Sequence, residues 1–222
     1  GVELVLSEGR DTGLSMMVQS VLIALAAAVL TTLVAALAAR AVSCYEWAGR
    51  KAFSFGLVTP FLIPTTVFAM GVQVLFIKAG IARTVPGVVL AHAIVALPYS
   101  AVIMMDMTDA VGTRLEDAAK ALGASPLKAV RRVTLPALLP GIVSSLSMAY
   151  IMSFSQYFLT LLIGGGAVRT LAVVMFPYLS GGDRTIAAAY GLVFIASTFA
   201  VFLFFEWLMR RFGMREDGEL YG

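Results

Sequence analysis

Five long apolar segments constrain the fold of this chain more than any other feature of its sequence. They cover residues 16–39, 55–77, 87–107, 138–163 and 186–209. A helix needs about 20 consecutive apolar residues to cross the hydrocarbon core of a bilayer. Inside lipid, only helices and closed barrels satisfy all the backbone polar groups. The sequence therefore predicts an all-α fold, a polytopic transmembrane helix bundle that forms a single domain over residues 1–222.

The composition agrees with a membrane protein and argues against other classes. Hydrophobic residues make up 60% of the chain and charged residues only 13%, whereas soluble domains carry about 25% charged residues. The net charge of +3 comes from basic residues at the ends of apolar segments. No basic patch with interleaved aromatic residues is present, so we expect membrane lipid and no nucleic acid as a partner. A single Cys and a single His provide no ligand spacing for a metal site.

The second and third segments contain residues that are unusual in a membrane span. Pro60 and Pro64 predict that the second span is kinked or broken near its beginning. His92 lies inside the third span, which also carries Asp106 near its end. A lone ionisable residue inside a bundle is a functional candidate. Because no acidic residue neighbours His92 in the sequence, we expect a hydrogen-bonded packing role instead.

The fourth segment carries a candidate solute path. Ser153, Gln156, Tyr157 and Thr160 are spaced i, i+3, i+4 and i+7, which places them in one polar stripe along a helix. Polar side chains are costly in lipid, so the stripe is expected to face the bundle interior. There it either forms hydrogen bonds between helices or lines the translocation path, and the sequence leaves both alternatives open.

The remaining apolar segments show packing and boundary features. In the first span Ala24 and Ala28 lie four apart, as do Thr32 and Ala36, which lets another helix approach closely. The apolar run over residues 171–179 is too short to cross a bilayer, so we expect an external loop with a short or re-entrant helix. The fifth span ends in residues typical of a membrane interface: Glu206, Trp207, Arg210 and Arg211.

A charged module lies between the third and fourth spans, over residues 113–137. Thr113 and Glu116 have the spacing of a capping box at the start of a helix. Its apolar face consists of Leu115, Ala118, Ala119 and Leu122. Gly123 is expected to end this helix, Ser125 and Pro126 to begin a second one, and Pro136 to end that one. The predicted unit is a rigid helix, glycine corner and helix.

The amino-acid sequence of the charged module resembles a known motif. Asp117-Ala118-Ala119, three residues, Gly123, nine residues and Val133-Thr134-Leu135-Pro136 resemble the EAA loop of the permease subunits of ATP-binding-cassette (ABC) importers. That pattern is Glu-Ala-Ala, x3, Gly, x9, Ile, x, Leu, Pro, so only Asp117 and Val133 depart from it. The resemblance implies a type I ABC importer permease, in which this loop is a cytoplasmic coupling helix that docks into a groove of the ATPase.

The resemblance also implies roles for the residues of the module. Leu115, Ala118, Ala119 and Leu122 would supply buried contact with the ATPase, and Gly123 would form the corner. Four charged residues would set the register at the rim: Glu116, Asp117, Arg131 and Arg132. Leu135 and Pro136 complete the motif.

The same resemblance implies partners. These are ABC ATPase subunits, a second permease subunit as a homo- or heterodimer, and an external solute-binding protein, all at the cell inner membrane. ATP and Mg²⁺ would bind the ATPase, so no cofactor is expected in this chain. Consistently, the phosphate-binding pattern GxxxxGK[ST] is absent and no catalytic residue is predicted.

The solute and the class of transporter remain more open. Residues 158–170, FLTLLIGGGAVRT, resemble permeases of the polyamine, ferric iron, thiamine and sulfate group. Polyamine is the first choice, and the other solutes, including an oxyanion, stay open. The rival class is an ATP-independent secondary transporter or channel. It would favour a charge at mid-membrane or an inverted repeat, and the sequence contains neither.

The distribution of basic residues predicts the orientation. Eleven Lys and Arg residues lie in the segments on the side of the charged module and five on the other side. By the positive-inside rule, the module is cytoplasmic and the N-terminus external. Permeases of the resembled family usually begin inside, so we expect that a first helix precedes this chain. A five-span subunit with an external start is the alternative.

Overall fold

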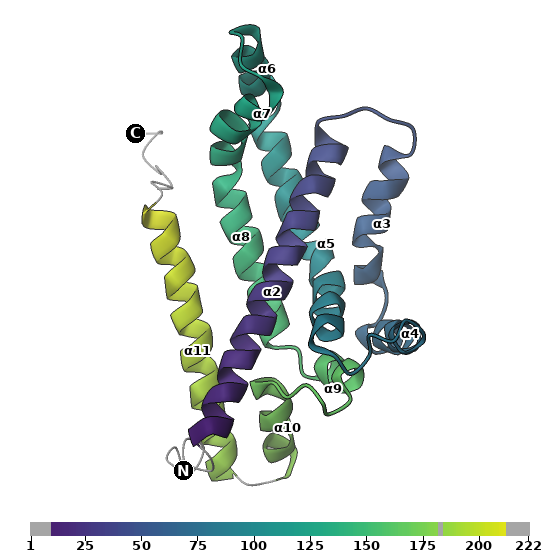
Figure 1. The fold of residues 1–222 in the computed structure, drawn as a ribbon, viewed down its shortest axis with the longest axis vertical. Helices are drawn as coiled ribbons and strands as arrows, with labels where there is room; N and C mark the ends of the chain where they lie inside the picture. The colour runs from purple at the N-terminus through teal and green to yellow at the C-terminus, as the bar shows by residue number, and fades with distance from the viewer. Residues whose placement is uncertain (1–9, 182–183, 212–222) are drawn as a thin grey trace.

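The computed structural model describes residues 10–181 and 184–211, and all their regular elements are helical (Figure 1). The all-α prediction is confirmed for these residues, whereas the predicted external N-terminus lies outside them. The helices are α2 (Arg10–Ser43), α3 (Arg50–Leu62), α4 (Thr65–Lys78), α5 (Val85–Val111), α6 (Arg114–Ala121), α7 (Pro126–Ala129), a π-helical turn (Val130–Thr134), α8 (Leu135–Phe154), α9 (Phe158–Gly164), α10 (Leu171–Gly181) and α11 (Arg184–Arg211).

Small residues allow α2, α5 and α8 to form the centre of the bundle. Ala24 and Ala28 of α2, Ala96 of α5 and Ala149 of α8 are all buried in one apolar cluster. The side chain of Thr32 forms a hydrogen bond of 2.9 Å with Ser145 of α8. Close helix approach at small residues is a standard packing mode inside membranes. The predicted packing role of the small residues in the first span is therefore confirmed at Ala24, Ala28 and Thr32.

Within residues 10–181 and 184–211, four helical stretches are long and apolar enough to cross a membrane. They are Ser15–Ser43, Val85–Val111, Pro126–Phe154 and Arg184–Leu208. Helices α3 and α4 would make a fifth span if counted together, but they are bent by 108°. The predicted short helix after the fourth span is confirmed as α10. At the end of α11, Glu206 forms an ion pair with Arg210.

The predicted break in the second span is confirmed at Pro64, and it separates α3 from α4. Pro60 is accommodated inside α3. Ile63 is extended and Pro64 precedes the first residue of α4. A residue before proline avoids the helical conformation because its backbone clashes with the proline ring. Ile63 therefore cannot continue α3, and the chain turns there.

The predicted fourth span, 138–163, is also not one helix. Helix α8 ends at Phe154, and α9 begins at Phe158 after a three-residue connection. The prediction that Pro136 ends a helix is wrong as well, since one continuous stretch runs over Pro126–Phe154. Within it, the backbone N–H of Leu135 bonds to the carbonyl of Val130, five residues back. This π-helical turn shifts the pattern of backbone hydrogen bonds just before Pro136. The proline then lies in the first turn of α8.

The charged module projects beyond the spans at one end of the bundle. Figure 1 shows α6 and α7 at the top, next to the end of α2, while α9 and α10 lie at the opposite end. The stretch from α7 to α8 runs from the projecting module into the centre of the bundle. The module is therefore joined covalently to the core by a helix rather than by a loop.

The close packing of α5 against α8 predicts a sensitive glycine. A Cβ added at Gly141 would lie 2.6 Å from Cγ and 2.8 Å from Cβ of Met107. We expect Gly141→Ala to lower the free energy of unfolding by about 1–3 kcal/mol, since the helices must move apart. Thermal unfolding of the detergent-solubilised chain measures the effect. Gly191→Ala is the matched control, because a Cβ there meets nothing within 4 Å. Equal melting temperatures for the two variants would show that the packing is looser than the structure indicates.

Candidate functional site

The glycine corner of the charged module forms as the sequence predicts. Helix α6 ends at Ala121, Leu122 is its C-cap, and Gly123 adopts a φ of +88°. The N–H of Gly123 bonds to the carbonyl of Lys120, and the N–H of Ala124 bonds to the carbonyl of Ala119. These two bonds define a Schellman motif. A side chain at Gly123 would be strained at this φ, so the corner requires glycine.

The predicted capping box is wrong. The side chain of Thr113 forms no cap hydrogen bond. Glu116, its expected partner, instead turns toward the end of α2, where Nη2 of Arg40 donates to both carboxylate oxygens at 2.8 and 2.9 Å. A charge-assisted hydrogen bond is stronger than a neutral one to a backbone N–H. The partner from another helix therefore displaces the local cap.

Glu116 is the centre of this site. Only 4% of the residue is exposed, although it carries a charge. Lys120 Nζ lies 2.8 Å from one carboxylate oxygen, and the hydroxyl of Thr134 donates to the other at 2.8 Å. The hydrogen bond from Arg40 is the main reason that the pKa of Glu116 falls to about 2. Lys120 and Thr134 lower the pKa further, and burial opposes them. The carboxylate is thus ionised and fully partnered.

The rim role predicted for Glu116 conflicts with its burial inside this chain, whereas most of the other predicted docking residues are exposed. The side chain of Asp117 is 61% exposed and pairs only with Lys120, at 3.4 Å. Leu115 and Leu122 are 59% and 90% exposed. Ala118, Arg131, Arg132, Leu135 and Pro136 are also exposed, and Ala119 is half-buried. The predicted docking residues thus form an outer surface, and Glu116 lies behind it.

The predicted polar stripe is also wrong as a single helical face, because the helix breaks inside it. Ser153 ends up on α8 and Thr160 on α9, and both reach His92 of α5. The Nδ1 atom of His92 lies 2.7 Å from the Ser153 hydroxyl, and Nε2 lies 2.9 Å from that of Thr160. All three residues are buried. The hydrogen-bonded packing role predicted for His92 is therefore confirmed.

The bonding pattern also assigns the protons of this triad. The Thr160 hydroxyl donates to the carbonyl of Gln156 at 2.6 Å. A hydroxyl has one hydrogen, so Thr160 must accept from Nε2 of His92. The Nε2 atom of His92 therefore carries a proton, and Nδ1 shares a hydrogen bond with the Ser153 hydroxyl. His92 thereby clamps both sides of the break between α8 and α9.

The other two stripe residues lie at the break itself. Gln156 and Tyr157 are half-buried and sit in the connection between the helices. The ring of Tyr157 stacks on Phe176 of α10, with centroids 3.8 Å apart. In this structure Ser153 and Thr160 therefore bond helices together, and of the four predicted path residues only Gln156 and Tyr157 are partly exposed.

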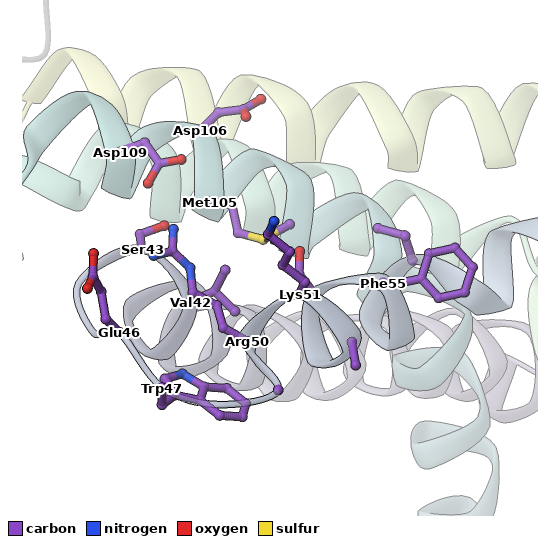
Figure 2. A pocket seen from close by; sticks show the side chains of 14 residues that line it. Val42, Ser43, Glu46, Trp47, Arg50, Lys51, Phe55, Met105, Asp106 and Asp109 are labelled. Carbon is purple, nitrogen blue, oxygen red and sulfur yellow. Dashed lines mark hydrogen bonds between the residues drawn. The ribbon is translucent and has the colours of Figure 1, made fainter.

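A pocket of about 1140 Å³ lies at the module end of the spans, between the α2–α3 connection and α5. Figure 2 shows Asp106 and Asp109 on one side and Arg50 and Lys51 on the other. Glu46 adds a third acidic side chain to the lining. Among the described residues no ion pair joins these acidic and basic groups. Over the same residues, no group of three or more His, Cys, Asp and Glu is arranged to hold a metal ion.

Sequence reasoning missed Arg40 and Thr134 as site residues. Arg40 was counted only among the basic residues that set the orientation. It lies 76 positions before Glu116, and no periodic pattern connects the two. The available signal was a basic residue in the last turn of a span together with an acidic residue in the adjoining module.

Comparison with known proteins identifies the family. The model of the binding-protein-dependent transport system inner membrane component matches residues 31–214, which is most of the chain. The chain belongs to this family. The predicted membership of the chain in the permeases of binding-protein-dependent importers is thereby confirmed, and the protein is a multi-pass inner membrane permease.

Individual relatives agree with the family. The spermidine/putrescine transport system permease protein PotC of Haemophilus influenzae is 28% identical over 91% of this chain and 79% of its own length. The sulfate transport system permease protein CysT of Salmonella typhimurium is 24% identical over 78% of this chain and 68% of its own. The putrescine transport system permease protein PotI of Escherichia coli is 28% identical over 78% and 66%. All three are named as transport system permease proteins, in agreement with the family of this chain.

The buried Glu116 predicts a pH dependence of the module. Its pKa is lowered in the folded state from 4.5 to about 2. Its carboxylate therefore stabilises the module fully above pH 4.5, and this contribution is lost as the pH falls from 4.5 toward 2. We expect hydrogen exchange in α6, corrected for intrinsic rates, to accelerate over that range. In Glu116→Gln, residue 116 does not titrate, so hydrogen exchange in α6 should depend less on pH. The same profile in both proteins would contradict the assignment.

The His92 clamp predicts coupled energetics. His92→Leu leaves the buried Ser153 hydroxyl without its partner and removes one of the two bonds of Thr160, so we expect a loss of about 1–3 kcal/mol in the free energy of unfolding. Ser153→Ala should cost less in the His92→Leu background than in the wild type, since the bond is already gone. A double-mutant cycle by denaturation measures this. Strictly additive losses would mean that His92 and Ser153 do not interact.

Proposed function

We propose that this permease, paired with a second permease subunit, forms the solute path of an ABC importer and that its charged module docks on an ATPase subunit. The observation that carries the proposal is the outer surface of the module. Leu122 is 90% and Leu127 77% exposed, at a place that projects beyond the spans (Figure 1). Exposed apolar residues gathered on a projecting element are typical of a protein-binding surface.

The residues of the module then divide into two groups. Leu115, Ala118, Ala119 and Leu122 supply apolar contact with the ATPase groove. Asp117, Arg131 and Arg132 remain exposed at the rim and set register. Glu116 does not touch the ATPase in this scheme and instead holds the module to its own spans.

The continuous helix from α7 to α8 gives the docked module a direct mechanical connection. The stretch Pro126–Phe154 has 29 residues, which corresponds to about 44 Å of helix. Closure of two ATPase subunits on ATP would move the module, and this helix would carry the movement into the bundle. ATP and Mg²⁺ belong to the ATPase, and an external binding protein delivers the solute.

A polyamine is the solute we favour. PotC and PotI are named as permeases for spermidine/putrescine and putrescine. In the pocket at the module end, Glu46, Asp106 and Asp109 outnumber Arg50 and Lys51, which favours a cation over an anion. Ferric iron and thiamine remain alternatives, as does an oxyanion, for which the sulfate permease CysT is the precedent.

Docking predicts that a charge at the module tip breaks ATPase binding. Leu122→Asp removes an apolar contact of about 1.5–3 kcal/mol and buries a charge, so we expect ATPase affinity to fall by more than about tenfold. Co-purification of the ATPase from detergent-solubilised membranes measures it. Ala167→Asp adds the same charge in an exposed loop at the other end of the bundle and should leave co-purification intact. ATPase retained by Leu122→Asp would remove the docking proposal.

The choice of a polyamine makes a separate prediction. Asp106→Asn combined with Asp109→Asn removes two acidic groups from the pocket. We expect the affinity for spermidine to fall by about tenfold and spermidine uptake to fall several-fold with it. The matched variant Arg50→Gln with Lys51→Gln should not lower uptake. Uptake of radiolabelled spermidine and sulfate by cells that express the whole transporter tests both. Accumulation of sulfate but not spermidine would replace the polyamine by an oxyanion.

A further inference from the structure

We propose that Arg40 is a positioning residue, which makes the cytoplasmic end of α2 move together with the charged module. The proposal rests on the function proposed above, in which the module receives the movement of the ATPase. It adds a second route from module to bundle, through an ion pair instead of through the chain. The residue assigned here lies in the last turn of a span and not in the module that docks.

The contacts of Glu116 join three separate elements. Arg40 is in the last turn of α2, Glu116 is on α6, and Thr134 ends the π-helical turn that leads into α8. Nη2 of Arg40 donates to both oxygens of Glu116, and the Thr134 hydroxyl donates to Oε2. Among the described residues, no other hydrogen bond or ion pair joins α2 with α6.

Burial makes this ion pair costly to separate. Only 5% of the Glu116 side chain is exposed, and 24% of that of Arg40. A buried charge that loses its partner is strongly unfavourable, whereas an exposed ion pair separates easily. Helix α6 therefore cannot move away from α2 without either exposing Glu116 or carrying α2 with it. Because α2 packs against α5 and α8 in the core, its movement reaches the centre of the bundle.

Lys120 provides a contrast within the same cluster. It pairs with the same carboxylate oxygen, at 2.8 Å, but it lies on α6 itself, one turn from Glu116. Its side chain is 39% exposed. Removing Lys120 weakens the charge balance without separating two elements. The ion pair of Arg40 thus crosses from one helix to another, whereas that of Lys120 stays within α6.

The identity of Arg40 is also significant. A basic residue at this end of a span is sufficient for orientation in the membrane, and Lys serves that purpose equally well. The guanidinium is planar and holds both carboxylate oxygens in a fixed geometry, whereas an ammonium on a flexible stem acts as a point charge. A purely topological residue would therefore tolerate Arg40→Lys, and a positioning residue would not do so fully.

The test uses the whole transporter, with ATPase and binding protein, in liposomes. It compares solute taken up per ATP hydrolysed, along with the amount of ATPase that co-purifies. For Arg40→Gln we expect the ATPase to remain bound and ATP hydrolysis to continue, while uptake per ATP falls by about tenfold. Arg40→Lys should fall between this variant and the wild type. Lys120→Gln should remain within about twofold of wild type.

A paired variant keeps the test valid if Arg40→Gln alone does not assemble. Arg40→Gln with Glu116→Gln leaves no buried charge unpaired, and two amides fill the same space, so this protein should assemble yet show the same loss of uptake per ATP. Wild-type uptake per ATP in either variant would overturn the proposal, as would an equal loss in Lys120→Gln. Absence of ATPase from the wild-type preparation would instead refute the proposed function itself.

Discussion

One buried carboxylate organises the part of this molecule that faces away from the membrane. Glu116 is ionised and 4% exposed, and such a charge is tolerated in a folded protein only when hydrogen-bonding partners surround it. Its partners come from the end of α2, from α6 and from the start of the α8 stretch. Satisfying one charge therefore fixes the position of the whole module. The leucines on the outward surface of the module are exposed, which leaves them available to a partner.

The same requirement shapes the interior of the bundle. His92 is buried in an apolar environment, and its two ring nitrogens bond to hydroxyls on either side of the break between α8 and α9. Polar groups inside a membrane are retained when protein satisfies them. The break is thus stabilised by a neighbouring helix. Both polar sites of this permease join elements that are distant in sequence, one at the module and one inside the spans.

The sequence was informative where a local rule determines the outcome. The apolar segments correctly predicted α2, α5 and α11. The glycine at the predicted corner, Gly123, adopts a φ of +88°, which favours glycine. Prediction from the sequence failed where a residue distant in the chain replaces a local one as the bonding partner. Glu116 does not form the predicted capping box, because Arg40, 76 positions away, binds its carboxylate. The stripe prediction failed because Thr160 bonds to His92, 68 positions away, on a separate helix. Pro136 did not end its helix because a π-helical turn precedes it.

The central claim is that this chain moves a solute only when an ATPase drives it through the charged module. Solute uptake into liposomes tests this most directly, with the chain reconstituted alone or with its ATPase and binding protein, in the presence and absence of ATP. The account predicts uptake only in the complete system and only with ATP on the side of the ATPase. Equal uptake by the chain alone, without ATP, would contradict it and would leave the exposed leucines of the module without a partner.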